Sequence, residues 1–153
     1  PVMILIPGNQ VTYREADKDF DRLNHFKVEE AGEKVAILAL GDFYQRGEQL
    51  SAKIKAELGF TPTLINPRFA SGIDKELLES LSERHQMVIT MEDGILSGGF
   101  GEKIASFYGS SDMKVKNYGL DKKFYDRYDP NELLKEVGMT PVQIIADICN
   151  QIK

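Results

Sequence analysis

The chain of 153 residues carries a net charge of −5 at pH 7, and 42% of its residues are hydrophobic and 28% charged. This length suits one domain with a hydrophobic core of its own. The acidic balance argues against a general nucleic-acid-binding protein, which needs clustered lysine and arginine. No apolar run approaches the roughly 18 residues that cross a membrane. We therefore expect a globular domain with neither nucleic-acid nor membrane partners.

The cysteine and histidine content also limits the function. Cys149 is the single cysteine, which excludes an internal disulfide and favours a reducing, cytoplasmic compartment. Because isoleucines occupy positions 145, 148 and 152, we expect Cys149 to be a buried hydrophobic side chain rather than a nucleophile. His25 and His85 have no second ligand at metal-binding spacing, so no metal site is predicted.

The first 25 residues differ from the rest. The apolar run VMILIPG follows Pro1 at once and predicts a strand that ends in a turn. Residues 9–25 are polar and poorly periodic, as a linker is. We expect residues 1–25 to be the end of a preceding domain and a linker, and residues 26–153 to form the domain proper. On this interpretation the chain is a piece of a longer protein.

Five runs predict β-strands, in chain order at 26–29, 35–40, 61–67, 87–90 and 113–118. The second and fourth runs are continuously apolar, which indicates strands buried on both faces of a parallel sheet covered by helices. The last run, MKVKNY, alternates as a half-exposed strand does.

The segments between and after these runs predict helices. A helix is expected over 43–59, where Leu50, Ile54 and Leu58 recur every four residues, and Gly59 is placed to end it. Asp74 is placed to cap the next helix. Together with the strands, this alternation predicts an α/β sandwich of three layers with a mostly parallel sheet.

Three further helices complete the pattern. Residues 100–108 place Phe100, Ile104 and Phe107 on one side of a helix. The last two helices start at Asp129-Pro130 and Thr140-Pro141, where a capping residue precedes proline and Glu or Gln stands at the third helical position.

Two loops at strand ends are candidate anion sites. The segment GDFYQRG lacks the Gly-Lys-Ser/Thr ending of a phosphate loop, and Asp42 would repel a phosphate, so a connecting turn is favoured. Arg68 follows a strand and could hold an anion or pair with a nearby carboxylate. The structural role is favoured, and Arg68 is kept as a weak anion-site candidate.

The stretch TMEDGILSGGFGEKI, residues 90–104, resembles a phosphate cradle because three glycines precede a helix. However, two acidic residues precede the glycines, and no lysine or Ser/Thr follows at the required place. Glycines also permit close approach of another backbone. The sequence therefore favours close packing, or an interface with another subunit, at Glu92, Asp93, Gly98, Gly99, Phe100 and Gly101.

Four stretches in order, KVAILALG, LINPRFASGID, MVITMEDGILSGGFGEKI and VKNYGLDKKFYDRYDPNELLKEVGMTPVQI, resemble a known family. Over about residues 26–152 the chain resembles the C-terminal domain of the transketolase superfamily, most of all that of 1-deoxy-D-xylulose-5-phosphate synthases. The family shares the Gly-Gly-x-Gly helix start and a Gly-Leu-x-x-x-Phe segment, which is Gly119-Leu120 and Phe124 here. β subunits of 2-oxo acid dehydrogenases share the glycines but match the YGLDKKFYDRY region less well.

The resemblance implies a five-stranded mixed sheet with one antiparallel strand. It implies a parent enzyme that is a thiamine-diphosphate- and magnesium-dependent homodimer, which joins pyruvate and glyceraldehyde 3-phosphate with loss of carbon dioxide. In that family the cofactor lies between the two preceding domains, whereas the C-terminal domain supports the dimer and has been proposed as a regulatory site. No residue here matches the family's Gly-Asp-Gly signature or its activating glutamate. We therefore expect no catalytic, cofactor or metal residue in this chain, which would be inactive alone.

One position departs from the family. Its middle domain usually ends in Arg-Tyr-Pro-Arg-Gly, whose first arginine helps to hold the substrate phosphate, and Leu5 stands at that place here. Leucine donates no charge-assisted hydrogen bond. The parent is therefore expected to be synthase-like, with another acceptor or another basic residue. Two alternatives stay open: a stand-alone α/β ligand-binding module, or the C-terminal part of a 2-oxo acid dehydrogenase β subunit.

Overall fold

A five-stranded sheet with the order β1-β3-β2-β4-β5 forms the centre of the computed structural model, which describes residues 1–4 and 22–152. The strands are β1 (Lys27–Glu30), β2 (Lys34–Ala39), β3 (Thr63–Asn66), β4 (His85–Ile95) and β5 (Lys114–Leu120). β1 runs antiparallel to β3, and the other neighbouring pairs are parallel. The expected five-stranded mixed sheet is thus confirmed.

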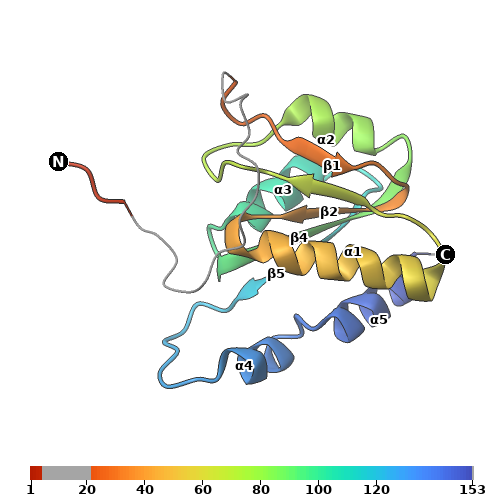
Figure 1. Cartoon of the computed structure of the whole chain (residues 1–153). Helices are drawn as coiled ribbons and strands as arrows, with labels where there is room; N and C mark the ends of the chain where they lie inside the picture. The colour runs from red at the N-terminus through yellow and green to blue at the C-terminus, as the bar shows by residue number, and fades with distance from the viewer. Residues whose placement is uncertain (5–21, 153) are drawn as a thin grey trace.

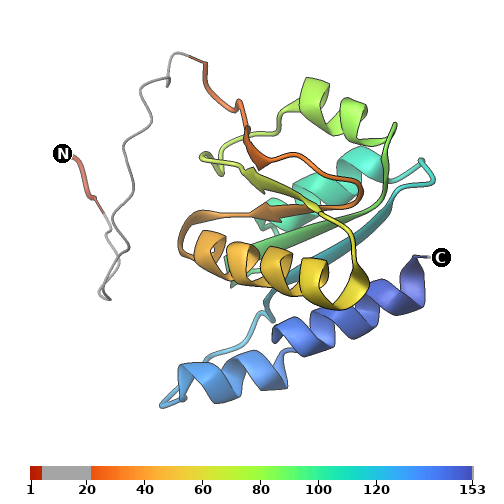
Figure 2. The ribbon, with the colours of Figure 1, turned by 45° about the vertical axis from the view of Figure 1, so that its right-hand side comes forward.

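Helices cover both faces of this sheet (Figures 1 and 2). α1 and α5 pack together on one face, and α2 and α3 lie on the other. α4 leads into α5. The helices are η1 (Gly41–Phe43, a 3-10 turn), α1 (Tyr44–Leu58), α2 (Lys75–Leu81), α3 (Phe100–Tyr108), α4 (Pro130–Glu136) and α5 (Pro141–Gln151). The α/β fold in three layers is as the sequence predicted.

Two hydrophobic clusters lie on opposite faces of the sheet. Val35 and Ile37 of β2 point into the cluster under α1 and α5, whereas Ala36 and Leu38 point into the cluster under α2 and α3. All four have no exposed surface. Burying a large aliphatic side chain contributes about 1.5–3 kcal/mol. The run at 35–40 is therefore apolar without alternation because both of its faces are buried.

The helix ends follow the expected chemistry. Asp74 accepts a hydrogen bond from Leu77 N at 3.2 Å, and Asp129 caps α4. Thr140 and Gln143 form a reciprocal capping box at the start of α5. Gly59 ends α1 with a φ of 74°, a conformation that favours glycine. These local predictions are confirmed.

The prediction that Cys149 is buried is wrong, because its side chain is exposed. In α5 the buried residues are Ile144, Ile145 and Ile148. These three isoleucines span about 100° of the helix surface, and Cys149 lies about 40° beyond Ile145, outside the buried face. Nearby isoleucines in sequence did not place it on their side of the helix.

β4 is the strand that differs most from its expected length. It continues past the expected end at residue 90 to Ile95, because Ile95 pairs with Leu120 of β5 after a register shift. None of the described helices is both long enough and apolar enough to cross a membrane. The extension of β4 carries Glu92 and Asp93 past the strand's expected end.

His85 at the start of β4 lies in a polar network between three segments. Its Nδ1 is 2.9 Å from Leu81 O, and its Nε2 is 2.7 Å from Thr63 Oγ1. The Thr63 hydroxyl oxygen also accepts a hydrogen bond from Gly32 N at 2.9 Å. Burial lowers the pKa of His85 below its ordinary value of 6.5. The folded chain therefore favours the neutral ring.

We expect the free energy of unfolding to fall as the pH drops below about 6.5. The unfolded chain binds the proton of His85 more tightly than the folded chain, because the folded pKa is lowered. This contribution is complete above the unfolded pKa and is lost as the pH falls through the folded value. Denaturant titrations over this pH range should show a weaker pH dependence in His85→Gln. An unchanged dependence in that variant would contradict the network.

Candidate functional site

The loops that follow the four parallel strands meet at one edge of the sheet, because the carboxyl ends of parallel strands lie at the same edge. Ligands of open α/β sheets bind at this edge. β1 begins there too, since it is antiparallel to β3. This carboxyl edge, which includes residues 67–74 and 92–99, is therefore the place to examine for a site.

Glu92 occupies the position at which a phosphate cradle would hold its anion. Its side chain is 5% exposed, and its two carboxylate oxygens accept hydrogen bonds from Phe100 N at 2.9 Å and Gly101 N at 2.8 Å. These amides belong to the first turn of α3, where unpaired N–H groups and the helix dipole favour a negative charge. The protein's own carboxylate thus fills the anion position at the start of α3.

The glycines make this arrangement possible by leaving out side chains. A Cβ atom on Gly99 would lie 2.8 Å from both Glu92 carboxylate oxygens. On Gly101 it would lie 2.6 Å from Thr90 Oγ1 and 2.7 Å from Asn117 Cγ. The Thr90 hydroxyl donates to Asn117 Oδ1 at 2.8 Å, so this pair links β4 to β5 beneath the helix. Gly99 and Gly101 therefore pack tightly against the chain's own strands.

The other predicted contact residues divide into a buried and an exposed group. Phe100 is 3% exposed and packs on Phe26, with ring centroids 5.9 Å apart. Asp93 and Gly98 are exposed. Gly98 has a φ of 77° and donates its N–H to Glu102 Oε2 at 2.7 Å. Asp93 and Gly98 are thus the members of this set whose surface is open to another molecule.

Arg68 fixes the segment that enters β1. Its Nε and Nη2 donate to His25 O at 3.1 and 2.8 Å. Asp74 holds the same segment, since Oδ2 accepts from Phe26 N at 3.0 Å and lies 3.3 Å from His25 Nδ1. Ser71 Oγ also donates to Asn24 Oδ1 at 2.7 Å. These contacts give Arg68 a structural role, because its guanidinium group holds the backbone carbonyl of His25.

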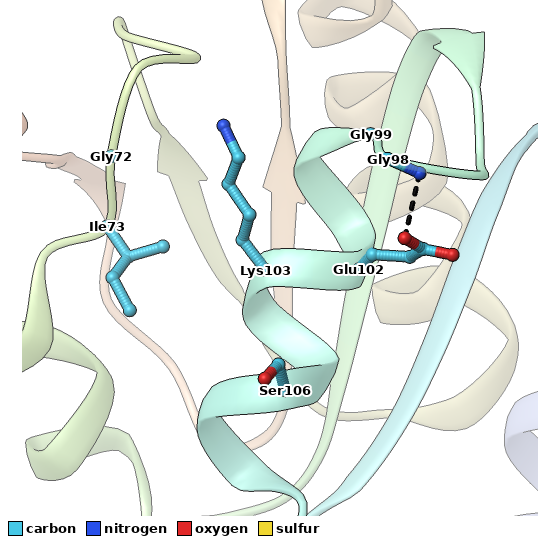
Figure 3. A pocket seen from close by; sticks show the side chains of 7 residues that line it. All are labelled: Gly72, Ile73, Gly98, Gly99, Glu102, Lys103 and Ser106. Atoms are coloured by element: carbon cyan, nitrogen blue, oxygen red, sulfur yellow. Dashed lines mark hydrogen bonds between the residues drawn. The ribbon is translucent and has the colours of Figure 1, made fainter.

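An open pocket of about 440 Å³ lies between this loop and α3. In Figure 3, Ile73 and Lys103 extend toward it from opposite sides, and Glu102 turns away toward Gly98. Lys103 Nζ donates to Ala70 O at 2.7 Å, which joins helix to loop. The pocket is lined by Gly72, Ile73, Gly98, Gly99, Glu102, Lys103 and Ser106. The two charged groups of its lining, Glu102 and Lys103, both form hydrogen bonds within the chain.

The residues present do not suit a metal–diphosphate group. Within residues 1–4 and 22–152, no three His, Cys, Asp or Glu side chains lie close enough together to hold a metal ion. Magnesium prefers carboxylate and phosphate oxygens, and the Glu92 carboxylate is already bonded to two helix amides. The Glu92 carboxylate is thus committed to the start of α3.

Comparison with known proteins places this geometry in context. Residues 24–144 match the family described as the transketolase C-terminal domain. The chain is 32% identical, over 99% of its length, to the 1-deoxy-D-xylulose-5-phosphate synthase of Shouchella clausii, and it spans 25% of that protein. It is 31% identical over 93% of its length to the synthase of Prochlorococcus marinus and spans 22% of it. The chain thus corresponds to about a quarter of these relatives.

A solved structure has the same fold. This structure, described as "Split gene transketolase, inactive beta4 tetramer", superposes on the chain with a TM-score of 0.73 at 23% identity. The alignment covers 84% of this chain and 42% of the other. At this identity the likeness concerns the fold.

Replacing Glu92 with glutamine should lower the free energy of unfolding by about 1–3 kcal/mol. The amide keeps one acceptor but turns an NH₂ group toward one of the two helix N–H groups. Denaturant unfolding measures the change. Asp93→Asn is the matched control, because Asp93 is the exposed neighbour, and it should change stability by no more than about 0.5 kcal/mol. Equal effects of the two substitutions would refute the capping role.

Gly101→Ala should destabilise the fold by about 1–3 kcal/mol, because its methyl group would overlap Thr90 and Asn117. Gly109→Ala at the end of the same helix is the control. Its Cβ would come no closer than 3.4 Å to Ser106 O, and its backbone is already helical. Thermal unfolding of both variants tests this, and a neutral Gly101→Ala would be incompatible with the tight packing described.

Proposed function

Because the chain belongs to the transketolase C-terminal domain family, we propose that it is the C-terminal domain of a thiamine-diphosphate-dependent enzyme similar to 1-deoxy-D-xylulose-5-phosphate synthase. Such an enzyme joins pyruvate and glyceraldehyde 3-phosphate with loss of carbon dioxide, in isoprenoid biosynthesis. The observation that carries the proposal is the 32% identity to a synthase over 99% of the chain. The chain's share of its relatives, about a quarter, fits a domain of a larger protein.

The proposed role of the domain is to support a homodimer, while the preceding domains hold thiamine diphosphate and magnesium. Two features support this division. The start of α3, the natural anion position of the carboxyl edge, is filled by Glu92. In the open pocket beside it, Glu102 accepts a hydrogen bond from Gly98 N and Lys103 donates one to Ala70 O, so both charged groups are engaged within the chain. This chain alone should therefore be inactive.

Residues 1–25 are proposed to connect the domain to the preceding one, in agreement with the way Arg68 and Asp74 anchor residues 25 and 26. Leu5, which replaces the phosphate-holding arginine of the family, lies outside the described residues. The proposed enzyme is therefore synthase-like, with another acceptor substrate or another basic residue for the phosphate. The lone exposed thiol of Cys149 suits a reducing compartment, and we place the enzyme in the cytoplasm.

A chimera tests the proposal directly. This chain would replace the matching C-terminal quarter of the Shouchella clausii synthase, and the truncated synthase without that quarter is the control. The chimera should form a homodimer and release carbon dioxide from pyruvate in the presence of glyceraldehyde 3-phosphate, whereas the truncated control should not.

The second arm uses the chain by itself. Calorimetric titration of thiamine diphosphate and Mg²⁺ into the 153-residue chain should give no binding heat. Saturable binding to the chain alone, or a folded and dimeric chimera without activity, would overturn the proposal.

A further inference from the structure

The segment between β5 and α4, residues 121–129, carries the most exposed aromatic side chain of the described residues. Phe124 is fully exposed, and Tyr128 is 53% exposed. We call residues 121–129 the aromatic loop. Ile95, which is 42% exposed, lies at its base because it pairs with Leu120. Exposed aromatic anchors of this kind are typical of the centres of protein interfaces.

The aromatic loop is held in place rather than left loose. Lys123 Nζ lies 3.2 Å from Glu136 Oε1 and 5.0 Å from the centre of the Tyr125 ring. The Tyr125 and Tyr128 rings meet edge to face with centroids 6.1 Å apart. Asp129 ends the loop by capping α4. Phe124 is therefore presented on a supported segment, which reduces the entropy that a partner's binding would cost.

Tyr125 adds a second observation. Its hydroxyl oxygen is buried and has no hydrogen-bond partner among the described residues. Buried tyrosine hydroxyl groups usually find a partner, and one left unsatisfied costs about 1–3 kcal/mol. The Tyr125 hydroxyl group is thus an unsatisfied polar group within the aromatic loop.

In the sequence of the loop, charged residues are placed symmetrically about Phe124. Lys122 stands two residues before it and Asp126 two residues after it, while Asp121 and Arg127 stand three before and three after. All four are exposed. If two copies cross with Phe124 on a two-fold axis, Lys122 faces Asp126 of the second copy. Asp121 likewise faces Arg127. Isologous interfaces require this self-complementarity.

We propose that the aromatic loop is the surface on which a second copy of this chain docks, with Phe124 at the two-fold axis. The inference rests on the proposed homodimer and names its contact surface. It places the contact on residues 121–129 rather than on Gly99 and Gly101, which pack inside the domain. Three positive and three negative side chains leave the loop without net charge, whereas an anionic membrane would require a basic excess.

Charge reversal tests the two-fold arrangement. Lys122→Glu places like charges opposite each other in its own dimer, and Asp126→Lys does the same with positive charges. The homodimer of each variant alone should have a dissociation constant at least about ten-fold higher than that of the unchanged chain. An equimolar mixture restores opposite charges at both contacts and should form a heterodimer. Sedimentation velocity over a concentration series measures all four samples.

Truncating the anchor gives an independent arm. Phe124→Ser should abolish the dimer of the 153-residue chain, whereas Val142→Ser, at an apolar residue 64% exposed at the start of α5, should leave it unchanged. A monomeric unchanged chain, a mixture that stays monomeric, or a loop that binds anionic vesicles while remaining monomeric would overturn the proposal. The chain is used alone, so these results are separate from the activity of the chimera.

Discussion

The carboxylate of Glu92, bonded to the amides of Phe100 and Gly101, is the interaction on which the organisation of the domain depends. It fixes the start of α3 against the end of β4. Gly99 must lack a side chain because the Glu92 carboxylate fills that space. Gly119 of β5 also leaves room for Glu92, since a Cβ atom on Gly119 would lie 3.2 Å from Glu92 Cγ. A buried carboxylate is stable here because the helix amides replace its lost hydration.

The same interaction decides what the carboxyl edge can do. In many α/β proteins this edge binds the anionic part of a ligand. Here α3 receives its anion from within the chain, and Arg68 is bonded to the carbonyl of His25. Two groups that resembled ligand-binding elements thus hold the domain together. In contrast, Phe124 of the aromatic loop is fully exposed.

Features set by neighbours in sequence were predictable, such as the caps at Asp74 and Thr140 and the doubly buried β2, because they depend on spacing of three or four residues or on an apolar run. The sequence also singled out Glu92 and the glycines as a packed region rather than a cradle. It could not show that the Glu92 carboxylate is the anion at the start of α3. That contact forms only when the chain after β4 turns back and brings Phe100, eight residues later, to Glu92. The bond from Phe26 to Asp74 spans 48 residues and leaves no local signal. The prediction that Cys149 is buried was wrong because closeness in sequence to buried isoleucines does not place a residue on their face of the helix.

The most direct test of this account is amide hydrogen exchange at Phe100 and Gly101, followed by NMR in the unchanged chain and in Glu92→Gln. First-turn amides of a helix exchange quickly unless a side chain accepts their hydrogen bonds. We expect both amides to be protected about as well as those of β4, and the substitution to remove protection there before it affects the rest of α3. Rapid exchange of both amides in the unchanged chain, or protection that survives the substitution, would contradict it.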